Sequence, residues 1–284
     1  MIVIASKAKQ SRTYKWIASS PVSLMPSRNK SHEDVSSIAM TNKYDITNIE
    51  VIMKNTAIIL SAGQGKRMQS DTPKQYLELK GKPILFYSLA AFSKVPGITN
   101  IIVVIDEKDR DFVKGEVIEK YHFDKVTDII TGGSERFHSV YNGLNAPGAD
   151  GSDFIFIHDG ARPFVDTEVI NRALNEINEY PAIVVGMPVK DTIKRVDEAN
   201  IVCETPDRKT LWAVQTPQVF SAPLIKEAYR LLMDEQKNGE MKHITDDAMV
   251  VETYTDTKVK LIPGSYRNIK ITTPEDLELA KGLV

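Results

Sequence analysis

The sequence AIILSAGQGKRMQSDTPKQYLEL, residues 57–79, joins an apolar run to a glycine-rich, cationic segment. Its first four residues are aliphatic and typical of a buried strand. Two close glycines follow, then Lys66, Arg67 and Lys74, with Pro73 directly before the last of these cations. Glycine turns after strands suit phosphate groups, because backbone N–H groups can approach an anion closely there. The stretch therefore predicts a strand that opens an α/β domain and ends in an anion-binding loop.

The rest of the chain alternates short apolar runs with helical periodicity. Apolar, β-branched runs predict strands at residues 57–60, 101–105, 126–130, 154–158 and 182–186. Helices are predicted at residues 83–95, 109–120, 139–144 and 169–177. Near-continuous apolar strands separated by helices indicate a mostly parallel sheet covered on both faces. With right-handed crossovers, this is a Rossmann-like, doubly wound α/β fold.

The C-terminal part continues the pattern with more irregular spacing. It predicts helices at residues 222–232, after 245 and at 274–283, and strands at 258–262 and 268–272. Ligands of doubly wound sheets bind beyond the carboxyl ends of the strands. Functional residues are therefore expected directly after Leu60, Ile105, Ile130 and His158.

Composition excludes several classes of protein. The 284 residues carry a formal net charge of -2, which gives no support for binding nucleic acid. The single cysteine, Cys203, excludes an internal disulfide framework and favours a reducing compartment. No apolar run reaches the roughly 18 residues that a membrane helix needs. We therefore expect no membrane association and a cytoplasmic location in a bacterium.

The first 52 residues differ from the rest, because they are rich in Ser, Lys and Arg, aperiodic, and nearly free of acids until Glu33. Such a segment is expected to be disordered. It is either a transit peptide, which would place the protein in a plastid, or a non-native leader with Met53 as the native start. The second interpretation is preferred, because the sequence after Met53 leads directly into the first strand. The predicted domains are a leader, 1–52, and one catalytic domain, 53–284.

Residues 188–214 interrupt the alternation and are predicted to form a β-hairpin arm. The segment around DTIKRV, 191–196, alternates in polarity, and a polar turn follows near residues 197–200. Because an isolated hairpin is marginal in water, the arm should pack on something. A partner subunit is expected to cover it; the alternative is a surface hairpin folded back on its own domain.

The opening loop fits neither of two familiar nucleotide fingerprints. A dinucleotide-binding loop needs a third glycine where Met68 stands, and a P-loop needs four residues between its glycines, where this loop has only Gln64. Two glycines and three nearby cations nevertheless suit a triphosphate whose charge shifts during a reaction. Because Pro73 restricts the backbone before Lys74, that cation is aimed.

Two further segments follow predicted strands and carry polar residues. TGGSERFHSV, 131–140, has Gly132 and Gly133 for close backbone approach and then a helix start that carries Arg136 and Ser139, where an anion or a polar base edge is favoured. HDGARPF, 158–164, places Asp159 at the end of a buried strand, where it suits a divalent cation such as magnesium. Arg162 can bind phosphate through two parallel hydrogen bonds. His158 ends an apolar strand and is expected to be structural.

Seven motifs, in order, resemble those of the 2-C-methyl-D-erythritol 4-phosphate cytidylyltransferase family. They are AGQGKRMQSDTPKQYL, GGSERFHSVYNGL, HDGARPF, DTIKRV, WAVQTPQVF, TDDAMVVE and NIKITTPEDLELA. The resemblance covers roughly residue 55 to the C-terminus. It implies a sheet of the nucleotide-diphospho-sugar transferase type and a homodimer in which each arm reaches the neighbouring active site.

The resemblance also implies roles for individual residues. The catalytic cations would be Arg67, Lys74 and Lys270. The CTP-binding residues would be Ser61, Ala62, Gly63, Gly65, Gly133, Ser139, Asp159 and Gly160, with Asp159 also near Mg²⁺ or another divalent cation. The residues that hold the sugar-alcohol phosphate would be Arg162, Thr192, Arg208, Thr216 and Lys270, with Thr192 and Arg208 supplied by the other subunit. Gly160 departs from the family pattern, in which alanine is more frequent.

The expected reaction is CMP transfer from CTP to methylerythritol phosphate, with release of pyrophosphate. The acceptor phosphate needs no general base, because its second pKa of about 6 leaves it largely dianionic at neutral pH. Two alternatives remain at this point: a ribitol-5-phosphate cytidylyltransferase, which is a sister family, and a non-catalytic nucleotide-sensing module on the same fold.

Overall fold

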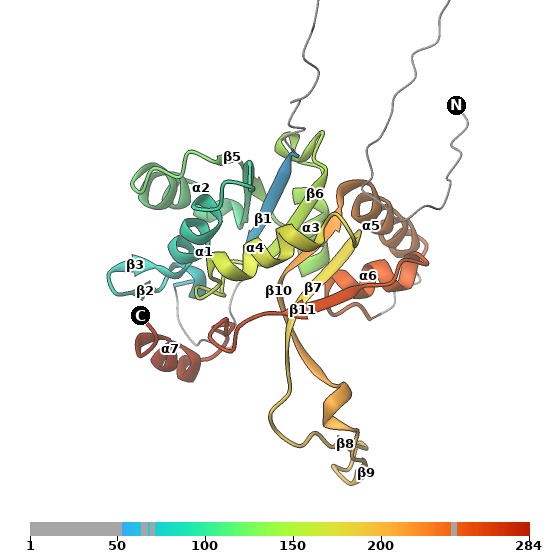
Figure 1. The fold of residues 1–284 in the computed structure, drawn as a ribbon. Coiled ribbons are helices and arrows are strands. Elements are labelled where there is room, and N and C mark those ends of the chain that lie inside the picture. Colours follow the sequence, from blue (N-terminus) through green and yellow to red (C-terminus); the bar gives the residue numbers. More distant parts are fainter. Residues whose placement is uncertain (1–52, 64–67, 69–71, 240–242) are drawn as a thin grey trace, which may run out of the picture. The chain divides into compact units, whose positions relative to one another are not determined.

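A seven-stranded sheet forms the centre of the protein in this computed structural model, which describes residues 53–63, 68, 72–239 and 243–284. The strand order is β11-β7-β10-β6-β1-β4-β5 (Figure 1). The strands are β1 (Asn55–Ser61), β4 (Asn100–Ile105), β5 (Val126–Thr131), β6 (Phe154–Asp159), β7 (Ala182–Pro188), β10 (Trp212–Ser221) and β11 (Lys260–Pro263). All neighbouring pairs are parallel except the two that involve β10. The predicted doubly wound, mostly parallel sheet is confirmed.

The chain reverses direction across the sheet next to β1. It passes from β1 to β4 and β5 on one side, and then returns to place β6 on the other side of β1. In such folds the crevice beyond the carboxyl ends of the strands at this reversal is the usual ligand site. Ser61 and Asp159 end the two strands that flank it.

Helices cover both faces of the sheet. They are α1 (Ile84–Ser93), α2 (Arg110–Phe112), α3 (Arg136–Leu144), α4 (Thr167–Glu176), α5 (Ala222–Lys237), α6 (Asp247–Tyr254) and α7 (Pro274–Lys281). Alternate residues of β1 enter two different cores: Ile59 packs in the cluster that contains residues of α1 and α4, and Ile58 packs in the cluster that contains residues of α3, α5 and α6. Because both faces of β1 are buried in a core, its sequence is continuously apolar.

Two predicted elements differ from the structure. The helix expected at 109–120 is α-helical only in α2 and continues as a π-helix over Val113–Glu119, after a 3₁₀ turn at Glu107–Asp109. The strand expected at 268–272 is wrong, because that segment lies outside the sheet. Its start is folded into tight turns, in which the N–H of Asn268 donates to the carbonyl of Ser265 and that of Ile269 to the carbonyl of Arg267.

The arm protrudes from the domain, as predicted. It carries the short strands β8 (Arg195–Val196) and β9 (Val202–Glu204), which pair with each other in a separate two-stranded sheet (Figure 1). A second small hairpin, β2 (Glu78–Leu79) and β3 (Lys82–Pro83), precedes α1. The return strand of the arm is β10, which runs on into the middle of the main sheet between β6 and β7.

The predicted leader, residues 1–52, lies outside the described residues, so the domain boundary at 52/53 stays a prediction. In the part of the chain that the structure describes, no helix has both the length and the apolar character to cross a membrane.

Candidate active site

Two adjoining cavities lie at the carboxyl ends of β1, β4, β5 and β6. The larger, of about 590 Å³, is lined by Ala62, Gly63, Ile105, Asp106, Glu107, Thr131, Gly132, Gly133, Ser134, Glu135, Arg136 and Ser139. The smaller, of about 170 Å³, is lined by Leu60, Ser61, Ala62, Gly63, Lys74, Gln75, Arg136, Ser139, Asp159, Ala161 and Lys270. Four residues line both, so the two cavities form one crevice at the position that the sheet topology predicts.

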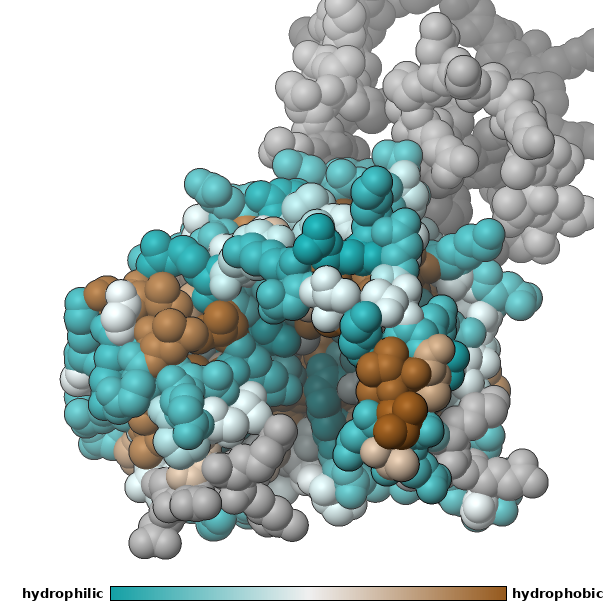
Figure 2. Space-filling model, turned by 90° about the horizontal axis from the view of Figure 1, so that it is seen from below, coloured by the Kyte–Doolittle hydropathy of each residue, from teal (hydrophilic) through white to brown (hydrophobic). Residues whose placement is uncertain are grey.

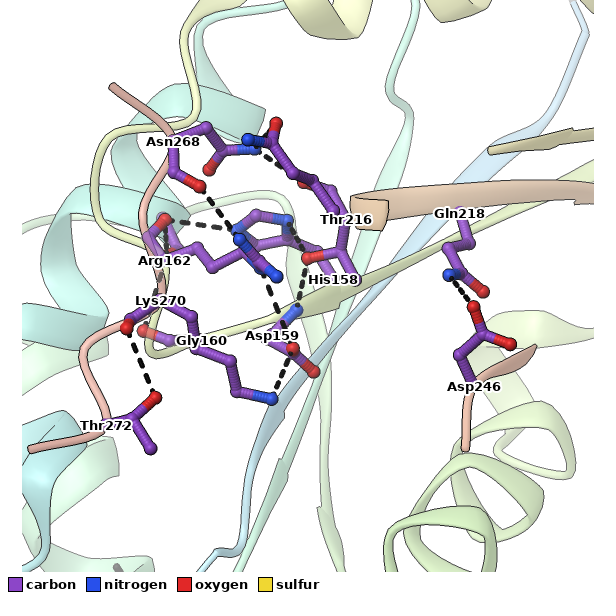
Figure 3. Close-up of polar contacts among 12 residues, drawn as sticks. His158, Asp159, Gly160, Arg162, Thr216, Gln218, Asp246, Asn268, Lys270 and Thr272 are labelled. Carbon is purple, nitrogen blue, oxygen red and sulfur yellow. Dashed lines mark hydrogen bonds and ion pairs between the residues drawn. The ribbon is translucent and has the colours of Figure 1, made fainter. Parts of the chain in front are cut away.

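The carboxylate of Asp159 is the electrostatic centre of the smaller cavity. Lys270 Nζ lies 2.8 Å from its Oδ2 (Figure 3). Arg136 Nε lies 3.3 Å from its Oδ1. Arg162 Nε lies 3.8 Å from Oδ2. Burial raises the pKa of Asp159, but Arg136, Lys270 and Arg162 outweigh burial and hold that pKa well below its usual range. Asp159 is therefore ionised at neutral pH.

Arg136 is an active-site residue that is absent from the predicted catalytic and binding residues. Besides Asp159, its guanidinium binds both carboxylate oxygens of Asp247, at 2.8 and 2.7 Å. Asp247 is completely buried, and Tyr229 Oη donates to its Oδ1 at 2.6 Å. Arg136 therefore connects the buried start of α6 to the carboxylate at the end of β6.

The start of α6 is itself fixed by β10. Asp246 caps the helix by accepting from the N–H of Met249 at 2.9 Å. The side-chain amide of Gln218, on β10, donates to Asp246 Oδ2 at 2.8 Å (Figure 3). The oxygen of the same side chain, Oε1, accepts from the N–H of Ala248 at 2.9 Å. Side chains of the motifs QTPQ and TDDA thus fix the start of α6, and this keeps Asp247 in contact with Arg136.

The turn after β5 packs closely against the opening loop. A Cβ atom at Gly132 would lie 2.4 Å from Ala62 Cβ, and one at Gly133 would lie 2.3 Å from His138 Cβ. The N–H of Gly133 donates to Ser139 Oγ at 3.1 Å. Only glycine fits at these two positions. The bond between Gly133 and Ser139 fixes this part of the wall of the larger cavity.

Gln75 holds the opening loop in place, a role that the sequence did not reveal. Its side-chain amide donates to the carbonyl of Ser61 at 2.6 Å and to that of Gly63 at 3.2 Å. Gln75 is 2% exposed and directly follows Lys74. The only signal in the sequence was its place directly after a predicted catalytic cation. Because Gln75 is fixed, Lys74 is presented to the smaller cavity.

His158 is buried and hydrogen-bonded on both sides, as expected for a structural histidine. Its Nδ1 lies 3.0 Å from Thr216 Oγ1, and its Nε2 lies 3.3 Å from the carbonyl oxygen of Arg162 (Figure 3). Thr216 Oγ1 also accepts from the N–H of Asp159 at 3.1 Å. The hydroxyl of Thr216 is thus engaged inside the domain, and the network fixes the backbone at both ends of HDGAR.

We expect stability to depend on the protonation of His158. Burial lowers the pKa of His158 to about 4, whereas an unfolded histidine titrates near 6.5. The unfolded chain therefore binds a proton first, and the free energy of unfolding should fall by about 3 kcal/mol as the pH falls from 6.5 to 4. Urea unfolding across this range, without nucleotide or divalent cation, measures the effect.

The control for that titration is His158→Asn. The variant should lose most of the pH slope between 6.5 and 4, whatever its absolute stability. Asp159 interferes little, because its lowered pKa begins to affect stability only below about pH 5, and most of that loss falls below pH 4. Equal slopes in the two proteins would show that His158 does not control stability in this range.

Gly160 follows Asp159 where the backbone of β6 passes close to β1. Its N–H donates to the carbonyl of Leu60 at 2.8 Å, and a Cβ atom here would lie 2.9 Å from that same oxygen. We expect Gly160→Ala to lower the free energy of unfolding by about 1–3 kcal/mol, as overpacking does. Gly115→Ala is the matched control, since a Cβ there meets nothing within 4 Å. Urea unfolding of both variants measures the cost, and an unchanged midpoint for Gly160→Ala would contradict it.

The predicted site residues fall into three groups. Those that line the crevice are Ser61, Ala62, Gly63, Lys74, Gly133, Ser139, Asp159 and Lys270. Gly160 and Thr216 are buried and Arg162 is partly buried, and none of the three lines the crevice. Those on the arm, and not among the residues that line this crevice, are Thr192 and Arg208. Gly65 and Arg67 lie outside the described residues, so their roles stay predictions.

Sequence comparison identifies the family. Residues 55–284 match the family model described as 2-C-methyl-D-erythritol 4-phosphate cytidylyltransferase. The chain belongs to this family. A curated relative of that name from Lachnospira eligens is 48% identical over 226 residues, which are 80% of this chain and 97% of the relative. One from Lachnoclostridium phytofermentans is 48% identical over 231 residues, which are 81% of this chain and 96% of the relative.

Solved structures of 2-C-methyl-D-erythritol 4-phosphate cytidylyltransferases share the fold. The 4-diphosphocytidyl-2C-methyl-D-erythritol synthase of Anaerococcus prevotii is similar with a TM-score of 0.71 and 34% identity, over 82% of this chain and 96% of that chain. The cytidylyltransferase of Francisella tularensis has a TM-score of 0.67 and 31% identity, over 81% of this chain and 100% of that chain. The predicted family and fold type are confirmed.

Membership of this cytidylyltransferase family narrows the functions that the sequence left open. The chain is a nucleotidyltransferase, as predicted, and not a sensing module on the same fold. The methylerythritol phosphate family is supported over its ribitol phosphate sister by the family match and by both curated relatives.

Proposed function

We propose that the protein transfers CMP from CTP to 2-C-methyl-D-erythritol 4-phosphate and releases pyrophosphate. The observation that carries this proposal is the ionised carboxylate of Asp159, which lies with Lys74 and Lys270 in one cavity beside the glycine turns. The relatives are named for the acceptor, 2-C-methyl-D-erythritol 4-phosphate, and for the cytidylyl group that they transfer.

Catalysis consists of positioning and charge stabilisation. A phosphate oxygen of the acceptor attacks the α-phosphorus of CTP, and a new P–O bond forms as the bond to the bridging oxygen of the pyrophosphate breaks. The electron pair of that bond leaves with the pyrophosphate. Lys74, together with Arg67, neutralises the charge that develops there, and Lys270 binds the acceptor phosphate. No proton needs to be removed, which agrees with a structural role for His158.

The larger cavity takes the cytidine part of CTP in this proposal. Gly133 and Ser139 form its wall and are fixed by the bond from the N–H of Gly133 to Ser139 Oγ, and the start of α3 provides N–H groups. The triphosphate then extends past Ala62 and Gly63, which line both cavities.

A divalent cation, Mg²⁺ in the first instance, fits the donor set. In the described residues no three His, Cys, Asp or Glu side chains are grouped as a metal cage. Mg²⁺ does not need one, because one or two carboxylates and the oxygens of a bound triphosphate suffice. Asp159 supplies that carboxylate. The metal would neutralise charge on the phosphates of CTP.

The arm is proposed to form a homodimer and to deliver Thr192 and Arg208 to the acceptor site of the neighbouring subunit. Its exposed apolar side chains support this: Ile193, Val196, Ile201 and Val202 are 40–63% exposed. Figure 2 views the molecule from below, where apolar side chains gather at the end of the arm. Such a patch on a marginal hairpin needs a covering surface. The proposed compartment is the bacterial cytoplasm.

Pyrophosphate release tests the proposed function. The purified protein is incubated with CTP and either methylerythritol phosphate, ribitol 5-phosphate or no acceptor, with Mg²⁺ and with EDTA. Release is expected with methylerythritol phosphate and Mg²⁺. Faster release with ribitol 5-phosphate would assign the sister function instead, and no release with either acceptor would refute both.

A further inference from the structure

The arm is joined to the domain by few contacts. At its base, Pro188 pairs with Trp212 across the β7–β10 ladder, and the N–H of Val189 donates to the carbonyl of Leu211 at 3.1 Å. Beyond that point the side chains of residues 190–205 are all exposed. A two-stranded ribbon on its own does not fix the angle at which its tip leaves the sheet.

Tyr266 lies against this base. Its hydroxyl donates to the carbonyl of Pro188 at 2.9 Å, and its ring centroid lies 3.6 Å from Lys190 Nζ. The side chain is 47% exposed, so it is not part of the core. The carbonyl of Lys190 in turn accepts from Arg208 Nη1 at 2.7 Å. One residue, Lys190, therefore connects Tyr266 to a predicted acceptor-binding arginine.

Tyr266 stands on a loop that the domain holds rigidly. The N–H of Gly264 donates to the carbonyl of Gly186 at 2.8 Å, and Gln215 donates to the carbonyl of Ser265 at 2.8 Å. Asn268 is completely buried and donates to the carbonyl of Thr216 at 2.8 Å (Figure 3). A side chain on such a loop can act as a fixed support for the base of the arm.

The same loop leads directly into the active site. Arg162 Nη1 donates to the carbonyl of Asn268 at 2.8 Å, and two residues later Lys270 Nζ contacts Asp159 (Figure 3). Tyr266, at the base of the arm, and Lys270, beside Asp159, are therefore four residues apart on one short segment.

We propose that Tyr266 is a positioning residue that braces the arm against the loop carrying Lys270. It sets the direction in which the arm leaves the sheet and the place of Arg208 on it. The inference rests on the proposed function, in which the arm completes the acceptor site of the neighbouring subunit. Tyr266 touches no substrate in this proposal; it acts through Lys190 and Arg208.

The brace predicts an effect on one substrate only. Removing Tyr266 should raise KM for methylerythritol phosphate by about tenfold, as expected for the loss of one exposed cation–π contact and one hydrogen bond. KM for CTP should stay within about twofold, because the cavities assigned to CTP contain no arm residue.

The test compares Tyr266→Ala, Tyr266→Phe and Tyr180→Ala with the wild-type enzyme. Phenylalanine keeps the ring for Lys190 and loses the hydroxyl, so its KM should lie between those of wild type and alanine. Tyr180 is the matched control, because its ring lies 5.0 Å from Lys260 Nζ and that tyrosine–lysine pair does not involve the arm. Tyr180→Ala should leave the ratio of the two KM values unchanged.

Hydrogen exchange of the amides in residues 189–211 provides a second measurement. Exchange should be faster in Tyr266→Ala than in wild type, and unchanged in Tyr180→Ala. Two results for Tyr266→Ala would overturn the proposal that Tyr266 braces the arm. One is a wild-type ratio of the two KM values together with wild-type exchange; the other is an equal rise in KM for methylerythritol phosphate and for CTP. If the wild type shows no transfer, the proposed function fails, and the exchange experiment still decides the brace separately.

Discussion

Replacing Lys74 with alanine is expected to lower kcat by two orders of magnitude or more, with little loss of stability. The loss corresponds to about 2.7 kcal/mol of transition-state stabilisation, which is typical for an aimed charged donor. Lys74 lies at the cavity with Asp159 and Lys270, and Gln75 behind it is fixed to the backbone of the opening loop. The charge that Lys74 meets develops only as pyrophosphate departs. Turnover should therefore fall more than CTP affinity does.

Steady-state kinetics and thermal unfolding of the same preparations test this expectation. Lys74→Arg keeps the charge in a larger, planar group and should be intermediate. Lys120→Ala is the control for a lysine removed from the surface, since Lys120 makes an exposed ion pair with Glu116. A folded Lys74→Ala enzyme with wild-type kcat would exclude the proposed mechanism.

The parallel part of the sheet could be predicted from the sequence because β1, β4, β6 and β7 are buried on both faces. Such strands are continuous apolar runs, and short runs alternating with helices leave few topologies. β10 could not be placed in the same way. Its first residues belong to the arm, and Pro217 argues against a central strand because it cannot donate to the ladder. The structure accommodates this proline with a register shift between Val214 and Gln218.

The crevice could be predicted in outline, because its residues directly follow strands. Partnerships between distant residues could not. Arg136 and Asp247 are 111 residues apart, and nothing local in either motif indicates that they form a pair. The expected strand at 268–272 was wrong for a related reason. Its alternation is real, but the turns at Asn268 and the bonds that the Asn268 amide donates to Gln215 and Thr216 keep the segment off the sheet.

The second large effect is expected for Arg136→Met, which should lower the free energy of unfolding by about 3–5 kcal/mol. Asp247 is completely buried, and among the described residues only Tyr229 remains to bind its carboxylate in the variant. Removing one partner of a buried pair leaves an uncompensated charge, which costs far more than the pair contributes. Urea unfolding measures the loss. Activity should fall as well, because Arg136 also contacts Asp159.

Two further variants separate this explanation from simple loss of packing. Arg136→Met combined with Asp247→Asn removes the stranded charge and keeps an acceptor for Tyr229, so much of the stability should return. Arg230→Met is the surface control: Arg230 binds Glu227 at 2.7 and 2.8 Å, but both side chains are more than half exposed, and the cost should be below about 1 kcal/mol. If the double variant is no more stable than Arg136→Met, the carboxylate of Asp247 is not the cause. If stability recovers in the double variant, the buried charge of Asp247 is what Arg136 neutralises in the wild type. The same arginine contacts Asp159, so one ion pair serves both the stability of the fold and the geometry of the site.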